Sequence, residues 1–283
     1  MNAGRSPVMK RRRLAAQLHR LRAASDLTLE AVAEHLECSP AKISRIENGQ
    51  VAVRIQDARE LLDLYEVKGE ERENLLQMVR QARRKGWWTA YADILAEDTE
   101  TLLSLEDEAA TISIYESNIV TGLLQTPRYA WELMTSWSDV PLEMVDRKAA
   151  LRVERQAVLE RIDAPALTVV LDEACLHRPV GNEEVMREQY RRLLEVSARP
   201  DELTLLILPF SAGAHQAMGF PFHLFSFSGN DHPIVYVELL NKGQFIEDIS
   251  EIARYSTAFN QVRDAALNPK ESREFLEGMI RRP

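Results

Sequence analysis

The chain has 283 residues, of which 45% are hydrophobic and 28% are charged, and its formal net charge is −9. This composition is typical of a globular protein of about two domains and excludes a disordered or fibrous chain. No apolar run approaches the roughly 18 residues of a membrane helix, and no apolar stretch follows the basic segment 1–13, so we expect neither a membrane partner nor a secretory signal. Two cysteines, Cys38 and Cys175, are too few for a disulfide framework or a four-cysteine zinc site. The sequence predicts a cytoplasmic protein without a metal centre or a cofactor.

Charge is divided unequally along the chain. Residues 1–90 hold 17 Lys and Arg against 12 Asp and Glu, a balance of +5, whereas residues 91–283 hold 18 against 32, a balance of −14. The first 22 residues contain seven basic and no acidic residues. This pattern favours a polyanionic partner for the first part of the chain, although a solvated basic tail would also explain it.

The first part of the chain, residues 9–85, has helical spacing of apolar residues throughout, with stripes at i, i+3, i+4 and i+7. Two of the predicted helices are short, at 28–37 and 40–48, and a tight turn joins them. Two short helices in this order predict a helix-turn-helix within an all-α domain.

The ends of these two helices carry specific signals. Thr28 and Ser39 are suitable N-caps, and Pro40 takes the first helical position, where a missing N–H costs nothing. Gly49 follows the second helix at the position of a left-handed C-cap. The capping residues therefore limit each helix to two or three turns.

The second short helix has two different faces. Ile43 and Ile46 point inward, whereas the outward face carries no acidic and no large apolar residue. A helix that enters the major groove of double-stranded DNA needs small or hydrogen-bonding side chains there. Arg45 can pair with a guanine edge, which contributes about 1–3 kcal/mol of discrimination. We expect DNA contacts from one set of residues in this region: Thr28, Pro40, Ala41, Lys42, Ser44, Arg45, Asn48 and Gln50.

The segment LTLEAVAEHLECSPAKISRIENGQ resembles the xenobiotic-response-element (Cro/repressor-like) helix-turn-helix family, over about residues 14–65. The resemblance implies a compact five-helix domain like that of λ repressor, with 40–48 as the helix that reads DNA. It also implies a structural ion pair between Arg22 and Glu47, so we do not interpret Glu47 as a catalytic carboxylate.

Beyond a basic junction at residues 80–91, the pattern becomes mixed. Runs rich in Val, Ile and Leu predict strands, and longer stripes predict helices. The predicted strands are 111–116, 167–172, 203–209, 222–228 and 233–239, with a hairpin turn at 229–231 between the last two. The predicted helices are 102–112, one from Pro127, 141–161, 183–197, 248–267 and 269–281. This order predicts a mixed α/β (α+β) domain over residues 91–283.

Catalysis in this second domain is an alternative that the motifs do not favour. The sequence lacks a His-Glu-x-x-His or Cys-x-x-Cys zinc motif, a G-x-S-x-G elbow and a phosphate loop. Cys175 and His177 lie two residues apart, which is poor geometry for a nucleophile and its base on a helix or a strand. We expect that the protein is not an enzyme.

A site for a ligand or partner is expected near the carboxyl ends of the strands, where mixed sheets tend to bind ligands. The loop 211–215 is rich in small residues whose backbone N–H groups suit an anion, although a plain tight turn explains it too. The candidate residues are Gln125, Arg178, His215 and Glu238.

The second domain also resembles a known family. The strings YESNIVTGLLQTPRYA, LRVERQ, LDEACLHRPVG, LPFSAGAH and VYVE are similar to the uncharacterised domain, DUF5753, that follows such helix-turn-helix modules in actinomycete regulators. The family usually has Pro before GLLQT, where this chain has Thr121. The resemblance implies an antitoxin-like regulator, encoded beside a very small partner protein and associated with development and antibiotic production.

The sequence thus predicts a cytoplasmic, nucleoid-associated transcription regulator that binds double-stranded DNA. We expect a homodimer because operators for such proteins have two-fold symmetry. In the main alternative the protein is an antitoxin-like module that neutralises the small partner, with autoregulatory DNA binding. A third hypothesis is an enzyme with a DNA-targeting domain.

Overall fold

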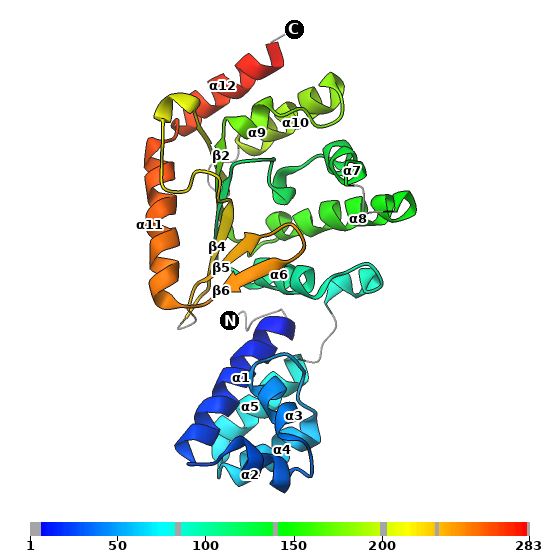
Figure 1. Cartoon of the computed structure of the whole chain (residues 1–283), viewed down its shortest axis with the longest axis vertical. Coiled ribbons are helices and arrows are strands. Elements are labelled where there is room, and N and C mark those ends of the chain that lie inside the picture. The colour runs from blue at the N-terminus through cyan, green and yellow to red at the C-terminus, as the bar shows by residue number, and fades with distance from the viewer. Residues whose placement is uncertain (1–6, 83–85, 138–140, 199–202, 230–231, 282–283) are drawn as a thin grey trace. The chain divides into compact units, whose positions relative to one another are not determined.

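The computed structural model describes residues 7–82, 86–137, 141–198, 203–229 and 232–281. The chain divides into two compact units, Met1–Ala90 and Tyr91–Pro283, which are coloured blue to cyan and cyan to red in Figure 1. The division falls within a short 3-10 helix, η1 (Trp87–Tyr91). Each unit has its own core and is described separately.

Within residues 7–82 the first unit consists of five α-helices. They are α1 (Pro7–Ala24), α2 (Leu29–His35), α3 (Pro40–Glu47), α4 (Ile55–Leu64) and α5 (Gly69–Ala82). Their apolar stripes meet in one core, which includes Leu18, Ile43, Leu61 and Val79. Each of these four side chains is almost completely buried, which confirms the all-α first domain.

The described part of the second unit contains a six-stranded mixed sheet of order β3-β2-β1-β4-β5-β6. The strands β1, β2 and β3 are parallel, whereas β4 pairs antiparallel with β1, β5 with β4 and β6 with β5. Their bounds are β1 (Thr111–Glu116), β2 (Ala166–Asp172), β3 (Leu203–Leu208), β4 (Phe222–Ser226), β5 (Ile234–Glu238) and β6 (Gly243–Ile246). The predicted mixed α/β architecture is confirmed.

Helices cover both faces of this sheet (Figure 1). One face packs on α11 (Ile249–Ala265), where Tyr115, Val170 and Phe222 of the strands meet Phe259 and other apolar residues of the helix. The helices α6 to α10 lie on the opposite side, and α12 (Pro269–Arg281) packs beside β3 and α10. The bounds on that side are α6 (Glu97–Glu108), α7 (Pro127–Thr135), α8 (Leu142–Glu154), α9 (Ala174–His177) and α10 (Glu183–Val196), with 3-10 segments η2 (Gly122–Leu124) and η3 (Arg155–Glu160). A fourth 3-10 segment, η4 (Phe210–Ala212), follows β3.

Two predicted helices end earlier than expected, and one strand was not predicted. The helix expected at 102–112 ends at Glu108, because Ala110 already pairs with the sheet through its N–H to Ser226 and its carbonyl to Ala166. The helix expected at 141–161 ends at Glu154 and tightens into η3. The strand β6 was not predicted, because four residues with a glycine form no apolar run.

Gly243 and the pairing of β4 with β5 shape the antiparallel part of the sheet, β4 to β6. A Cβ at Gly243 would lie only 2.4 Å from the ring of Tyr236, so the missing side chain is what lets β6 pair with β5. Of the predicted turn at 229–231, residues 230 and 231 lie outside the described residues, but β4 and β5 are antiparallel neighbours as a hairpin requires.

Candidate nucleic-acid interface

Side-chain caps define where α2 and α3 begin. The Oγ1 of Thr28 accepts a hydrogen bond from the backbone N–H of Ala31 at 3.2 Å, and the Oγ of Ser39 accepts one from the N–H of Lys42 at 3.3 Å. Each bond satisfies one of the N–H groups that a helix start leaves without a partner. The local chemistry of two hydroxyl side chains therefore limits both helices.

Glycine is required immediately after α3. Gly49 has φ of 68°, in the left-handed region, and a Cβ there would lie 3.4 Å from the Cα of Arg12 on α1. The chain thus reverses directly against α1, and α3 ends after two turns. The first helical position of α3 is Pro40, as predicted from the sequence.

The helix α3 presents a polar surface to solvent. Ile43 and Ile46 are buried, whereas Ala41, Arg45 and Asn48 are exposed, together with Gln50 beyond the helix. The Nδ2 of Asn48 donates to the Oγ of half-buried Ser44 at 3.3 Å. Thr28 and Pro40 are also exposed, at the starts of α2 and α3.

Glu47, the one carboxylate of α3, is turned away from this surface. Its oxygens accept hydrogen bonds from the Nε and Nη2 of Arg22 at 2.8 and 2.9 Å, and the Nη1 of Arg22 donates to the carbonyl of Leu27 at 2.8 Å. The hydrogen bonds to Glu47 raise the pKa of the Arg22 guanidinium. The pair ties α1 to α3 and removes a negative charge from the side on which phosphates would lie.

Lys42 is engaged within the domain. Its Nζ lies 2.6 Å from the Oδ2 of Asp57 in the first turn of α4. The predicted DNA contact by Lys42 would require this pair to open. This ion pair could not be predicted from local sequence, because 15 residues and a turn separate Lys42 from Asp57.

The structure does not assemble the four candidate residues of the second domain into one site. Gln125 is buried, with its Nε2 2.6 Å from the carbonyl of Val120 and its Oε1 3.2 Å from Nη1 of Arg152, on the side of the sheet that carries α8. His215 belongs to the opposite side, where its Nε2 lies 3.5 Å from the hydroxyl of Tyr115. The other two candidates are exposed and lie on different elements, Arg178 directly after α9 and Glu238 at the end of β5.

The segment GLLQT around Gln125 has a structural role that the sequence did not reveal. The buried amide of Gln189 accepts from the N–H of Thr126 and donates to the carbonyl of Leu124, both at 2.8 Å. The Nε2 of Gln156 donates to the carbonyls of Gly122 and Gln125, at 3.0 and 2.8 Å. Two glutamines distant in sequence thus hold the loop before α7.

The polar residues near Cys175 have structural partners. Cys175 is buried, with its Sγ 3.3 Å from the carbonyl of Glu116, and this burial raises the pKa of the thiol well above its ordinary value. His177 faces Glu173 at 3.1 Å, and the Oδ1 of Asp172 accepts from the N–H of Ala174 at 2.8 Å. A thiol held protonated, with its neighbouring histidine paired elsewhere, does not form an activated nucleophile.

The described residues include neither a metal-binding cluster nor a membrane-spanning helix. Among them, no group of three or more His, Cys, Asp or Glu side chains is arranged to hold a metal ion. None of the described helices has both the length and the apolar character needed to cross a membrane.

In a comparison with known proteins, two family models match separate segments of the chain. The model of a helix-turn-helix domain matches residues 13–75, which include α2 and α3. The model described as a domain of unknown function (DUF5753) matches residues 99–278, which include the whole mixed sheet. Neither the curated proteins nor the solved structures include a significant match.

Proposed function

The chain belongs to the DUF5753 family and carries a helix-turn-helix domain of the kind that binds DNA, and from this premise we propose that it is a sequence-specific transcription regulator. In this proposal α3 reads base edges in the major groove of double-stranded DNA. The second domain binds a partner or ligand, mediates dimerisation and so alters the affinity for DNA. The protein acts on the nucleoid in the cytoplasm and carries out no catalysis.

The observation that carries this proposal is the outward surface of α3. It combines the exposed guanidinium of Arg45 with the small side chain of Ala41 and the amide of Asn48, while Glu47 is tied to Arg22. This combination supports base contacts from the exposed face, because no carboxylate of the helix opposes a phosphate. The contacts expected from Thr28, Pro40, Lys42, Ser44 and Gln50 belong to the same proposal.

Binding-site selection from random DNA, performed with the full chain, tests the proposal. The expected result is an inverted repeat that is bound far more tightly than scrambled DNA. Arg45→Ala should weaken binding to the selected site by roughly tenfold or more, because one bidentate contact with guanine is lost. Arg80→Ala, which removes an exposed arginine at the end of α5, is the matched control and should leave affinity unchanged.

A salt titration distinguishes reading of bases from attraction of phosphates. If selection enriches no sequence and affinity falls steeply with salt for every DNA, the basic segment 1–13 alone accounts for binding and the proposal is wrong. Sedimentation of the free chain and of its DNA complex measures the proposed homodimer. Co-purification of a small protein encoded nearby, in fixed stoichiometry with this chain, would support the antitoxin-like alternative.

A further inference from the structure

A cavity of about 310 Å³ lies in the second domain between α11 and the segment that joins β3 to β4. Its floor is apolar, formed by Phe222, Ala217 and Ala258, all of them buried. This volume is at the lower end of the range typical of small-molecule sites, which begins at about 300 Å³. The cavity therefore has room for a compact ligand of one or two rings.

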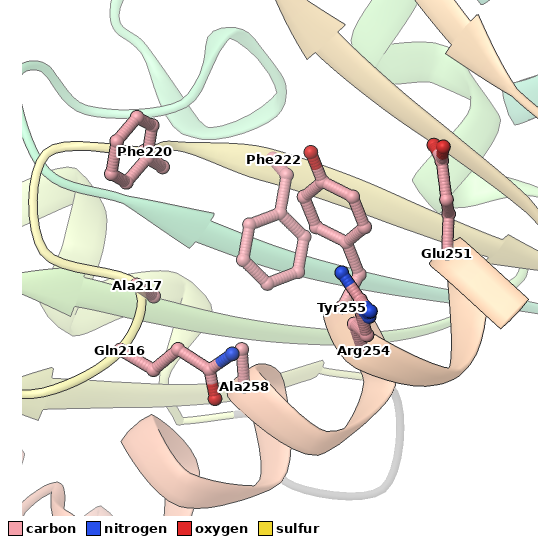
Figure 2. Close-up of a pocket in the computed structure, with 8 residues that line it drawn as sticks. All are labelled: Gln216, Ala217, Phe220, Phe222, Glu251, Arg254, Tyr255 and Ala258. Carbon is pink, nitrogen blue, oxygen red and sulfur yellow. The ribbon is translucent and has the colours of Figure 1, made fainter.

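Three aromatic side chains line the cavity. The rings of Phe222 and Tyr255 are 5.0 Å apart in an edge-to-face arrangement, and Figure 2 shows them side by side at the centre of the site. Phe220 lies at the edge and is 67% exposed, on the connection between β3 and β4. Gly219, with φ of 79° and free space around it, directly precedes Phe220. An exposed ring beside an apolar cavity is typical of a surface that a ligand covers.

The polar groups of the cavity are available for a ligand. Within the part of the chain that the structure describes, the side chains of Gln216 and Arg254 form no hydrogen bond or ion pair. Figure 2 shows the Gln216 amide and the Glu251 carboxylate at opposite ends of the site, with Arg254 between them beside Tyr255. Two hydrogen-bond donors, one of them charged, thus line an aromatic-walled cavity and suit an anionic acceptor placed away from Glu251.

We propose that this cavity binds a small molecule with a planar aromatic body and a carboxylate or similar anionic group. The body packs on Phe222 and Tyr255 beneath Phe220, and the anion faces Arg254 and Gln216. This inference specifies the ligand class for the regulatory domain and rests on the proposed function only for its link to DNA affinity.

The probe for the test is 8-anilino-1-naphthalenesulfonate, which joins an aromatic body to an anion. Fluorescence titration of the full chain should give saturable binding of one molecule per chain. Phe220→Ser and Arg254→Gln should each weaken binding by about tenfold, because they remove an aromatic contact and a charge-assisted hydrogen bond. Both residues are exposed, so the variants should unfold at the temperature of the wild type.

Matched controls lie close by in the chain. Phe210→Ser removes a similarly exposed phenylalanine outside the cavity lining, and Arg263→Gln removes an arginine on the same helix as Arg254, so neither should change affinity. The uncharged relative N-phenyl-1-naphthylamine should bind more weakly and should not respond to Arg254→Gln.

Equal binding of the probe by wild type, Phe220→Ser and Arg254→Gln would overturn the proposed site, as would the absence of saturable binding. Equal affinity for the charged and uncharged probes would overturn the anionic part of the ligand class. Neither outcome depends on DNA, so failure of the site and failure of the regulator proposal are distinguishable.

Discussion

Arg22 on α1 and Glu47 on α3 are joined by hydrogen bonds of 2.8 and 2.9 Å across 25 residues of sequence. Both side chains are largely buried, at 14% and 5% exposed. The pair therefore fixes the end of α3 relative to α1 while it neutralises the one carboxylate of the helix. The pair thus adds to the core contacts of Ile43 and Ile46 in orienting the proposed DNA-reading surface.

Loss of this pair should destabilise the first domain. Glu47→Gln leaves the guanidinium of Arg22 largely buried without its counter-charge, and we expect a loss of about 2 kcal/mol in the free energy of unfolding. Chemical denaturation of the full chain measures it. Asp63→Asn, which breaks the more exposed pair with Arg72, should cost less than about 1 kcal/mol, and equal costs would contradict the structural role of Glu47.

The pair between Lys42 and Asp57 should restrain DNA binding. Asp57→Asn frees the ammonium of Lys42 for a phosphate and removes a negative charge beside it, so affinity for DNA should rise several-fold. The slope of log affinity against log salt should steepen by about 1, since one more phosphate is neutralised. The double variant Lys42→Ala with Asp57→Asn should lose this steepening, and its persistence would show that Lys42 makes no phosphate contact.

In the second domain, the ion pair between Arg155 and Glu106 should contribute strongly to stability. The Nε of Arg155 donates to Glu106 at 2.6 Å, and both side chains are at least 90% buried. Glu106→Gln should lower the free energy of unfolding by about 3–5 kcal/mol, because it leaves a buried charge without its partner. Glu274→Gln, in an exposed pair with Lys270, should change it by less than about 1 kcal/mol. A small effect at Glu106 would mean that water reaches the pair.

The two cysteines should differ in reactivity. Burial raises the pKa of the Cys175 thiol, whereas Cys38 is partly exposed in the turn before α3. A thiol reagent added to the native chain at pH 8 should therefore label Cys38 first, and Cys175 only after unfolding. Because the folded-state pKa of Cys175 lies above its unfolded value, its contribution to stability is present at neutral pH and decreases as the pH rises above about 8.5. Equal native labelling rates would contradict the buried environment of Cys175.

The sequence by itself determined features that depend on neighbouring residues, such as the ends of short helices and the positions of apolar strands. Thr28, Ser39, Pro40 and Gly49 predicted the bounds of two short helices because each acts on backbone groups within four residues of its own position. The strands β1 to β5 were predictable for a similar reason, since an apolar run such as 167–172 is suited to burial between two layers of helices, whereas the short β6 was not.

What only the tertiary structure decided is the set of neighbours across long sequence separations. The placement of β4 beside β1 puts Gln125 and His215 on opposite sides of one sheet, although both follow strands in the sequence. The partner of Lys42 and the glutamines that hold the GLLQT loop depend on packing in the same way. Hydrogen bonds and ion pairs of this kind need the backbone to bring side chains together within about 3 Å, and no local propensity encodes that meeting.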